Sequence, residues 1–188
     1  MLYAVVLGLL IGKALGGHFE RIGELRIRWA TLAILGLAVQ LALFSAPVTE
    51  AIGDLGAPIY VGSSAAVFAV VLRNWRLPGL PIVALGAGSN LTAIVANGGY
   101  MPASPEALAA LGTHLGPEYS NSAAVAAPFL APLTDAFALP HWLPFANVFS
   151  IGDALIGLGV LVALVLVMRR GTATAAEPWP EPVAAPSR

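Results

Sequence analysis

Long apolar stretches dominate the chain and are separated by shorter polar segments. A helix that crosses a membrane needs about 20 mainly apolar residues. Five stretches meet or nearly meet that length: 2–17, 27–46, 57–72, 78–97 and 151–168. This pattern predicts an all-α fold, an integral membrane helical bundle of five transmembrane helices that occupies residues 1–170.

Basic residues alternate between the connections of these predicted spans. Lys and Arg flank the first connection, occur in the third and follow the last span, whereas the second (47–56) and fourth (98–150) contain none. Because short cytoplasmic loops of membrane proteins are enriched in Lys and Arg, the N-terminus is expected outside and the C-terminus inside. Residues 171–188, rich in Pro and Ala without an apolar period, predict a disordered cytoplasmic tail.

The composition supports a lipid environment and narrows the function. Hydrophobic residues make up 58% of the chain and charged residues 10%, against about 25% charged in soluble domains. The net charge of −1 argues against a nucleic-acid partner, and the absence of cysteine excludes disulfides and thiol chemistry. Eight of the nine basic residues are Arg, which is typical of GC-rich bacterial genomes. We therefore expect the bilayer of a bacterial cell membrane as the partner.

The fourth connection, which is expected to be exoplasmic, carries two further helix patterns. Ser104 as N-cap, Pro105 in the first turn and Gly112 as a stop predict a short helix over 105–111. Apolar residues recur every four positions in 123–139, which predicts a helix in the interface plane or against the bundle. A sixth span over 123–139 is the alternative, although the segment contains Pro128 and Pro132.

Several motifs resemble one family. Leu77-Pro78-Gly79-Leu80 precedes the fourth span, Asn97-Gly98-Gly99-Tyr100-Met101-Pro102 follows it, and Phe149-Ser150-Ile151-Gly152-Asp153 opens the fifth. Together they look like a bacterial domain-of-unknown-function family of small multi-pass membrane proteins with Asn-Gly-Gly-x-Met-Pro and Phe-Ser-Ile-Gly-Asp motifs. The resemblance supports the topology and the choice of residues, and it implies no activity.

The fourth span contains the polar residues that invite a binding hypothesis. Asn90 and Asn97 are seven residues apart and therefore share one helix face, which Gly86 extends. An amide that faced lipid would lack hydrogen-bond partners, so both are expected to face inward. Hydrogen bonding between helices is the simpler interpretation, and a polar pocket open to the outside is the alternative.

Asp153 is expected in the first turn of the fifth span, on the same side as Asn97. Ser150 and Asp153 have the spacing of a capping box, and a carboxylate there meets the positive end of the helix dipole. The alternative is that Asp153, Asn97 and the Gly98-Gly99 backbone form a binding mouth for a cation or a polar ligand.

Gly8, Gly12 and Gly16 form two overlapping GxxxG patterns in the first span, which permit close approach of another helix. The partner helix belongs either to the same chain or to a second copy or membrane partner protein. Both interpretations remain open at this point.

Metal and enzyme chemistry have weaker support. His114 and Glu118 are four residues apart, and His141 and Asp135 could join them, but Gly116-Pro117 would interrupt a helix between the pair. No cofactor or metal is therefore predicted. The leading hypothesis is a non-enzymatic accessory, scaffold or receptor-like membrane module. The alternatives are ligand or ion binding and transport at a mouth between spans four and five, and an exoplasmic enzyme.

Overall fold

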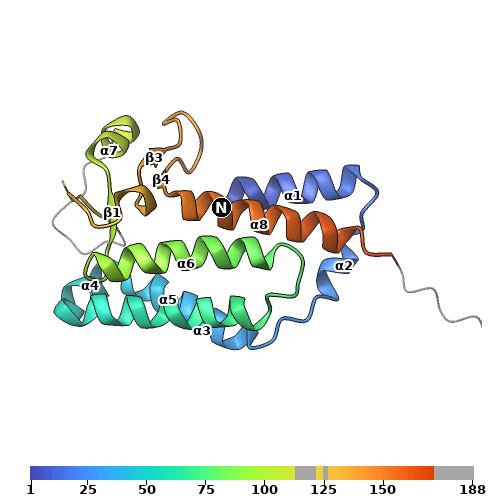
Figure 1. The fold of residues 1–188 in the computed structure, drawn as a ribbon, viewed down its shortest axis with the longest axis horizontal. Helices are drawn as coiled ribbons and strands as arrows, with labels where there is room; N and C mark the ends of the chain where they lie inside the picture. The colour runs from blue at the N-terminus through green and yellow to red at the C-terminus, as the bar shows by residue number, and fades with distance from the viewer. Residues whose placement is uncertain (113–121, 125–126, 172–188) are drawn as a thin grey trace, which may run out of the picture.

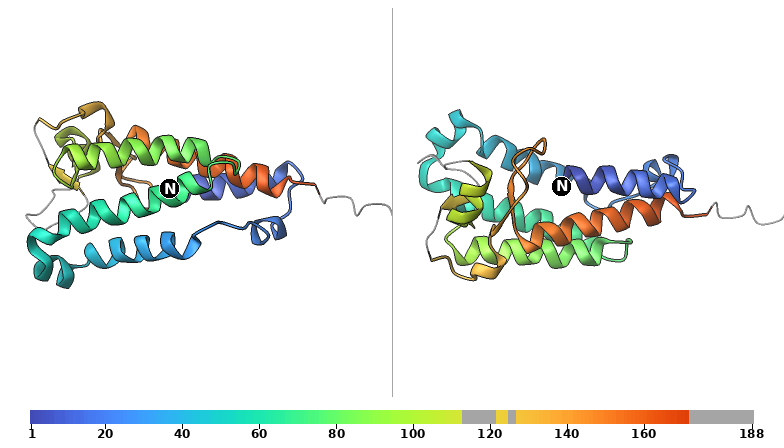
Figure 2. Two further views of the ribbon diagram at one scale, coloured as in Figure 1. Left: turned by 60° about the horizontal axis from the view of Figure 1, so that its bottom comes forward. Right: turned by 90° about the horizontal axis from the view of Figure 1, so that it is seen from above.

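A computed structural model describes residues 1–112, 122–124 and 127–171 of the chain, which is mostly helical (Figure 1). One helix covers most of each of the five predicted spans. These five helices are α1 (Leu2–Ala14), α3 (Ala30–Leu43), α5 (Gly56–Arg73), α6 (Leu80–Ala96) and α8 (Ile151–Met168). They run roughly along the long axis of the molecule, and their packing order is α1, α8, α6, α5, α3 (Figures 1 and 2).

The helix found in the second predicted span, α3, is shorter than the apolar stretch 27–46. α3 begins only after Trp29, whose backbone is left-handed with φ 61°. Beyond Leu43, a separate short helix α4 (Ala46–Ile52) starts with a proline in its first turn, and the 3₁₀ helix η1 (Gly53–Leu55) follows. The connection to α5 is therefore helical. A further short helix, α2 (Glu20–Gly23), lies in the first connection, at the opposite end of the molecule.

The short helix α7 (Pro105–Leu111) confirms the prediction for 105–111. The Ser104 side chain accepts a hydrogen bond from the Ala107 amide at 3.0 Å, and Gly112 ends the helix with φ 71°. This positive φ suits a glycine, which has no Cβ to clash with the backbone.

The predicted helix over 123–139 is wrong, and so is an all-α description of this segment. Its described residues contain the strands β2 (Ser122–Ala124) and β3 (Phe137–Ala138) and the 3₁₀ turn η2 (Ala131–Leu133). Two prolines explain the failure, because each lacks an amide donor and disfavours the helical conformation of the residue before it. The segment instead forms backbone pairs with distant residues. β2 pairs in parallel with β1 (Met101–Ala103), and β3 pairs antiparallel with β4 (Val148–Phe149).

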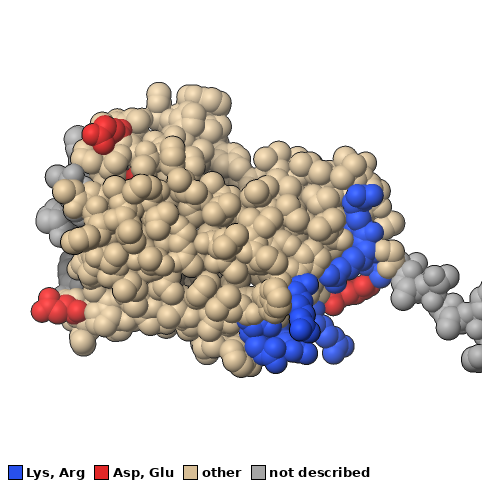
Figure 3. Space-filling model, in the orientation of Figure 1, with Lys and Arg blue, Asp and Glu red and all other residues tan. Residues whose placement is uncertain are grey.

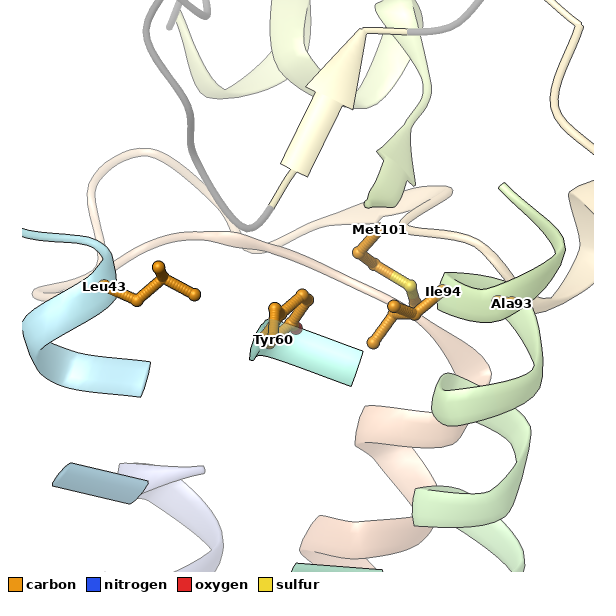
Figure 4. Packing of buried hydrophobic residues seen from close by; sticks show 5 residues of the cluster. All are labelled: Leu43, Tyr60, Ala93, Ile94 and Met101. Carbon is orange, nitrogen blue, oxygen red and sulfur yellow. The ribbon is translucent and has the colours of Figure 1, made fainter. Parts of the chain in front are cut away.

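A small hydrophobic core joins the strand end of the molecule to the helices. The side chains of Tyr60, Ile94 and Met101 converge there from α5, α6 and β1, with Leu43 of α3 nearby (Figure 4). Met101 is 5% exposed and Ala93 is fully buried. This cluster holds the segment after α6 against the bundle, and it thereby fixes the loop that covers the site described below.

By length and composition, two helical stretches of the described chain could cross a membrane, Gly53–Arg73 and Ile151–Met168. Three shorter helices, α1, α3 and α6, are also apolar. Large hydrophobic side chains nevertheless remain on the surface of these helices, among them Leu41 at 79% and Leu85 at 68% exposure.

Candidate functional site

The start of α8 carries the capping box that the sequence predicted. The Ser150 hydroxyl accepts a hydrogen bond from the Asp153 amide at 3.0 Å, and the Ser150 amide donates to Oδ2 of Asp153 at 3.1 Å. Two amides at the helix start thereby gain acceptors that the helix itself cannot supply. The carboxylate of Asp153 is held in place against the first turn of α8.

Asn90 of α6 completes a network with these two residues. Its Nδ2 donates to Oδ1 of Asp153 at 2.8 Å, and its Oδ1 accepts from the Ser150 hydroxyl at 2.9 Å. Both oxygens of the carboxylate therefore accept a hydrogen bond, and the Ser150 side chain is completely buried. Asn90, Ser150 and Asp153 together form a closed polar network between α6 and α8, which we call the Asn90 network.

Two glycines allow the helices to approach closely enough for this network. A Cβ on Gly152 would collide with the Asn90 side-chain oxygen, and a Cβ on Gly86 would collide with the carbonyl oxygen of Gly152. Since these contacts leave no room for a side chain, α6 and α8 meet through their backbones at this level. Gly86 was expected on the Asn90 face, whereas the role of Gly152 follows only from the packing of the two helices.

Two cavities adjoin the Asn90 network. The larger, of about 620 Å³, lies between α1, α8 and the loop that joins β3 to β4, and Tyr3, Phe145 and Phe149 contribute aromatic rings to it. The smaller, of about 200 Å³, lies among α3, α5, α6 and α8. Asp153 and Asp135 line both cavities. Two carboxylates thus lie at the boundary between the cavities.

Asp135 reaches this position through backbone pairing. Its amide donates to the Pro102 carbonyl at 2.8 Å, and its carbonyl accepts from the Ser104 amide at 3.0 Å, on either side of a parallel bridge to Ala103. The residue is only 6% exposed. The sequence suggested Asp135 only as a metal ligand of the loop, and its burial follows from backbone pairing with residues distant in sequence.

Asn97 has a different role from Asn90. Its Oδ1 accepts from the Phe129 amide at 2.9 Å, and its Nδ2 donates to the carbonyls of Phe129 and Ala93 at 2.9 and 2.8 Å. Gly98 and Gly99 follow with φ 75° and 94°. None of these three residues is among those that line the two cavities. The structure therefore unites Asn90 with Asp153, while Asn97 fastens the covering loop.

The comparisons with known proteins identify a family. A family model described as a family of unknown function, DUF5317, matches residues 24–165. The chain belongs to this family. The matched region includes Asn90, Asp135 and Asp153 and excludes α1. No curated protein and no solved structure matches the DUF5317 chain.

The first-helix glycines pack against the same chain. A Cβ on Gly8 would lie 3.2 Å from the backbone of Leu161, and one on Gly12 would lie 2.7 Å from the sulfur of Met168, both in α8. Gly16 has no neighbour within 4 Å of such a Cβ and adopts φ 81°. Gly8 and Gly12 therefore serve the contact between α1 and α8 of this DUF5317 chain.

Among the residues that the structure describes, no group of three or more His, Asp or Glu side chains is arranged to hold a metal. His114 and Glu118 lie outside the described residues. His141 is exposed in the loop between β3 and β4. The smaller cavity, by contrast, gathers uncharged polar groups beside the acids, including Gln40, whose Nε2 donates to the Ser64 hydroxyl at 3.2 Å.

Proposed function

We propose that this DUF5317 protein spans the bacterial cell membrane five times, with its N-terminus outside and its C-terminus inside. The hydrophobic surface supports the proposal. Leu10 of α1, Ile34 and Leu41 of α3 and Leu85 of α6 are each more than 60% exposed. Lipid would remove these side chains from water, whereas a soluble monomer would leave them in it.

The distribution of charge supports the orientation. Lys and Arg gather at one end of the face seen in Figure 3, where α1 and α8 end and α3 begins, and the strand end of that face lacks them. The sequence agrees, because no Lys or Arg occurs between Arg76 and Arg169. The basic end is the one expected in the cytoplasm.

Single cysteines test the orientation directly, since the chain has none of its own. Ala110 lies exposed on α7, and Gly23 lies exposed at the basic end with no neighbour within 4 Å of an added Cβ. A membrane-impermeant maleimide should label Ala110→Cys in intact spheroplasts and label Gly23→Cys only after permeabilisation. The reverse pattern, or equal labelling of both before permeabilisation, would refute the proposed topology.

Within this topology, the function that the geometry supports best is binding of a small, positively charged organic molecule beneath the outer loop. The observation that carries it is the pair of carboxylates, Asp135 and Asp153, on the walls of both cavities. Among the described residues Asp153 forms no ion pair. Aromatic rings of the larger cavity, including Tyr3 and Phe149, add surfaces that attract cations. The protein would then act as a receptor-like module and not as an enzyme.

Hexylammonium is a suitable probe, because its alkyl chain suits the apolar walls and its ammonium group suits the acids. We expect it to raise the midpoint of thermal unfolding of the purified protein, and we expect hexanol, which is uncharged, to have a much smaller effect. Asp153→Asn and Asp135→Asn should each weaken hexylammonium binding about tenfold or more, as loss of a hydrogen bond to a charged group predicts.

Glu106→Gln is the matched control, because it removes one exposed acid from α7 at the same end of the molecule without touching either cavity. It should bind hexylammonium like the parent protein. The binding proposal fails if hexanol stabilises the protein equally, or if Glu106→Gln weakens binding as much as the two cavity variants do.

A role as an accessory subunit is the second candidate, and one observation favours it. α1 packs mainly against α8, and on the side away from Gly8 and Gly12 it exposes Val6 at 44% and Leu10 at 62%. A second copy or a membrane partner protein would dock on this apolar side, because the glycine side is already occupied within the chain.

A further inference from the structure

Four arginines that are distant in sequence meet at the basic end of the molecule. Arg26 and Arg28 precede α3, whereas Arg73 ends α5 and Arg76 lies in the connection to α6. All four line one cavity of about 480 Å³. Figure 3 shows Lys and Arg side chains gathered at this end of the visible face. The cluster therefore surrounds a concave space and is more than a row of charges along a loop.

A buried asparagine holds the two arginine segments together. Asn74 is 7% exposed, its Oδ1 accepts from the Arg28 amide at 2.9 Å, and its Nδ2 donates to the Arg28 carbonyl at 2.8 Å. The same Nδ2 donates to the Val70 carbonyl of α5 at 2.8 Å. This two-point contact copies the pairing of neighbouring strands and spans 46 residues of sequence. The contact fixes the distance between the segment of Arg26 and Arg28 and the segment of Arg73 and Arg76. Orientation in a membrane requires only that basic residues lie in these loops, not that they are held at a fixed distance.

Among the described residues, no acid on the cavity wall neutralises the four arginines. No Asp or Glu lines the cavity, and the ion pair found among the described residues, Arg21 with Glu24, involves none of the four arginines. One guanidinium also lies over an aromatic ring, since Cζ of Arg73 is 5.8 Å from the centroid of the Trp29 ring. The remaining walls include Leu72, Trp75 and Leu77. The cavity thus combines a high positive charge with an apolar side.

We propose that this cavity binds a phosphate group. Arginine donates paired hydrogen bonds that match phosphate oxygens, and four guanidinium groups can neutralise its charge. In the proposed topology the cavity lies at the inner membrane surface, where anionic phospholipids present such groups beside acyl chains. The phospholipid source rests on that topology. Binding of a free phosphate compound does not depend on that topology, so a phospholipid and a soluble phosphate compound can be distinguished as ligands.

Two ligand pairs test the proposal on the purified full chain. Phosphatidylglycerol is compared with diacylglycerol of the same acyl chains by native mass spectrometry, and inorganic phosphate is compared with chloride at equal ionic strength by thermal unfolding. We expect retention of phosphatidylglycerol but not of diacylglycerol. Arg28→Gln combined with Arg76→Gln should weaken phosphatidylglycerol binding about 30-fold. Stabilisation by inorganic phosphate alone would identify a soluble phosphate compound as the ligand instead.

Lys13→Gln combined with Arg169→Gln removes two exposed positive charges from the same end of the molecule without touching the cavity, and it should retain phosphatidylglycerol like the parent. Asn74→Leu keeps all four arginines and removes the contact that positions them, so it should weaken binding even when circular dichroism shows a folded helical protein. The proposal is overturned if neither phosphate ligand binds better than its control. It is also overturned if the Lys13 and Arg169 variant loses as much affinity as the cavity variant.

Discussion

Replacing Gly86 by alanine is expected to lower the free energy of unfolding by about 3 kcal/mol, the upper part of the range for an overpacked interior. The added methyl group would collide with the carbonyl oxygen of Gly152 and lie 2.8 Å from the amide nitrogen of Ile156. Both obstacles are backbone atoms of α8, so no change of side-chain rotamer can relieve the overlap. The helices would have to separate, and the hydrogen bonds between Asn90 and α8 would lengthen with them.

Gly62 provides the control, because it is also a glycine within an apolar helix but a Cβ there would meet nothing within 4 Å. Gly62→Ala should leave stability unchanged or raise it by up to about 1 kcal/mol through helix propensity. Unfolding by sodium dodecyl sulfate in mixed micelles, followed by circular dichroism, measures both variants. Equal stability of Gly86→Ala and Gly62→Ala would show that α6 and α8 do not pack through Gly86.

Features encoded over a few neighbouring residues could be predicted from the sequence. The apolar stretches located all five long helices, because an uninterrupted apolar run long enough for a helix is visible within one segment of sequence. The Ser104 cap of α7 and the capping box of Ser150 and Asp153 were also predicted, and both have the expected hydrogen bonds. A capping motif is recognisable because its partners lie three residues apart.

Features that depend on distant pairing were missed. The strands β1 to β4 are two or three residues long, too short for a period of alternating residues to reveal them. Asp135 therefore seemed to belong to a helix, whereas pairing with Pro102 and Ser104 places it beside Asp153 at the cavities. Asn74 was not singled out either, since an asparagine after a helix is ordinary and its partner Arg28 is remote in sequence.

The candidate site was accordingly predicted in part. Asn90 and Asp153 were both candidate binding residues, but the sequence pointed to Asn97 as the neighbour of Asp153, whereas the structure shows Asp153 bonded to Asn90. Asn97 shares the helix face of Asn90, but it lies at the C-terminal cap of α6, where its side chain reaches the Phe129 backbone. Side chains on one face of a helix point the same way. Their contacts still differ, because Asn90 faces α8 whereas Asn97 faces the loop that contains Phe129.

Asn90→Leu should lower the free energy of unfolding by about 2 kcal/mol, the second largest loss expected after that of Gly86→Ala, because it removes the centre of the Asn90 network. Hydrogen bonds between membrane helices average about 0.6 kcal/mol. Asn90 should exceed that average because its amide serves two partners, a carboxylate and a hydroxyl that is completely buried. Leucine would leave the buried Ser150 hydroxyl without its acceptor, and an unsatisfied polar group is costly inside the protein. Mixed-micelle unfolding again provides the measurement.

Gln40→Leu is the appropriate comparison, since Gln40 makes one side-chain hydrogen bond, at 3.2 Å to the neutral Ser64, and should cost less than about 1 kcal/mol. A double-mutant cycle of Asn90→Leu with Ser150→Ala then separates coupling from the loss of the helix cap. We expect a coupling energy of about 1 kcal/mol, because each residue completes the hydrogen bonding of the other. Additive effects would mean that the hydroxyl and the amide act independently, so that the contact between them adds no coupling energy to the fold.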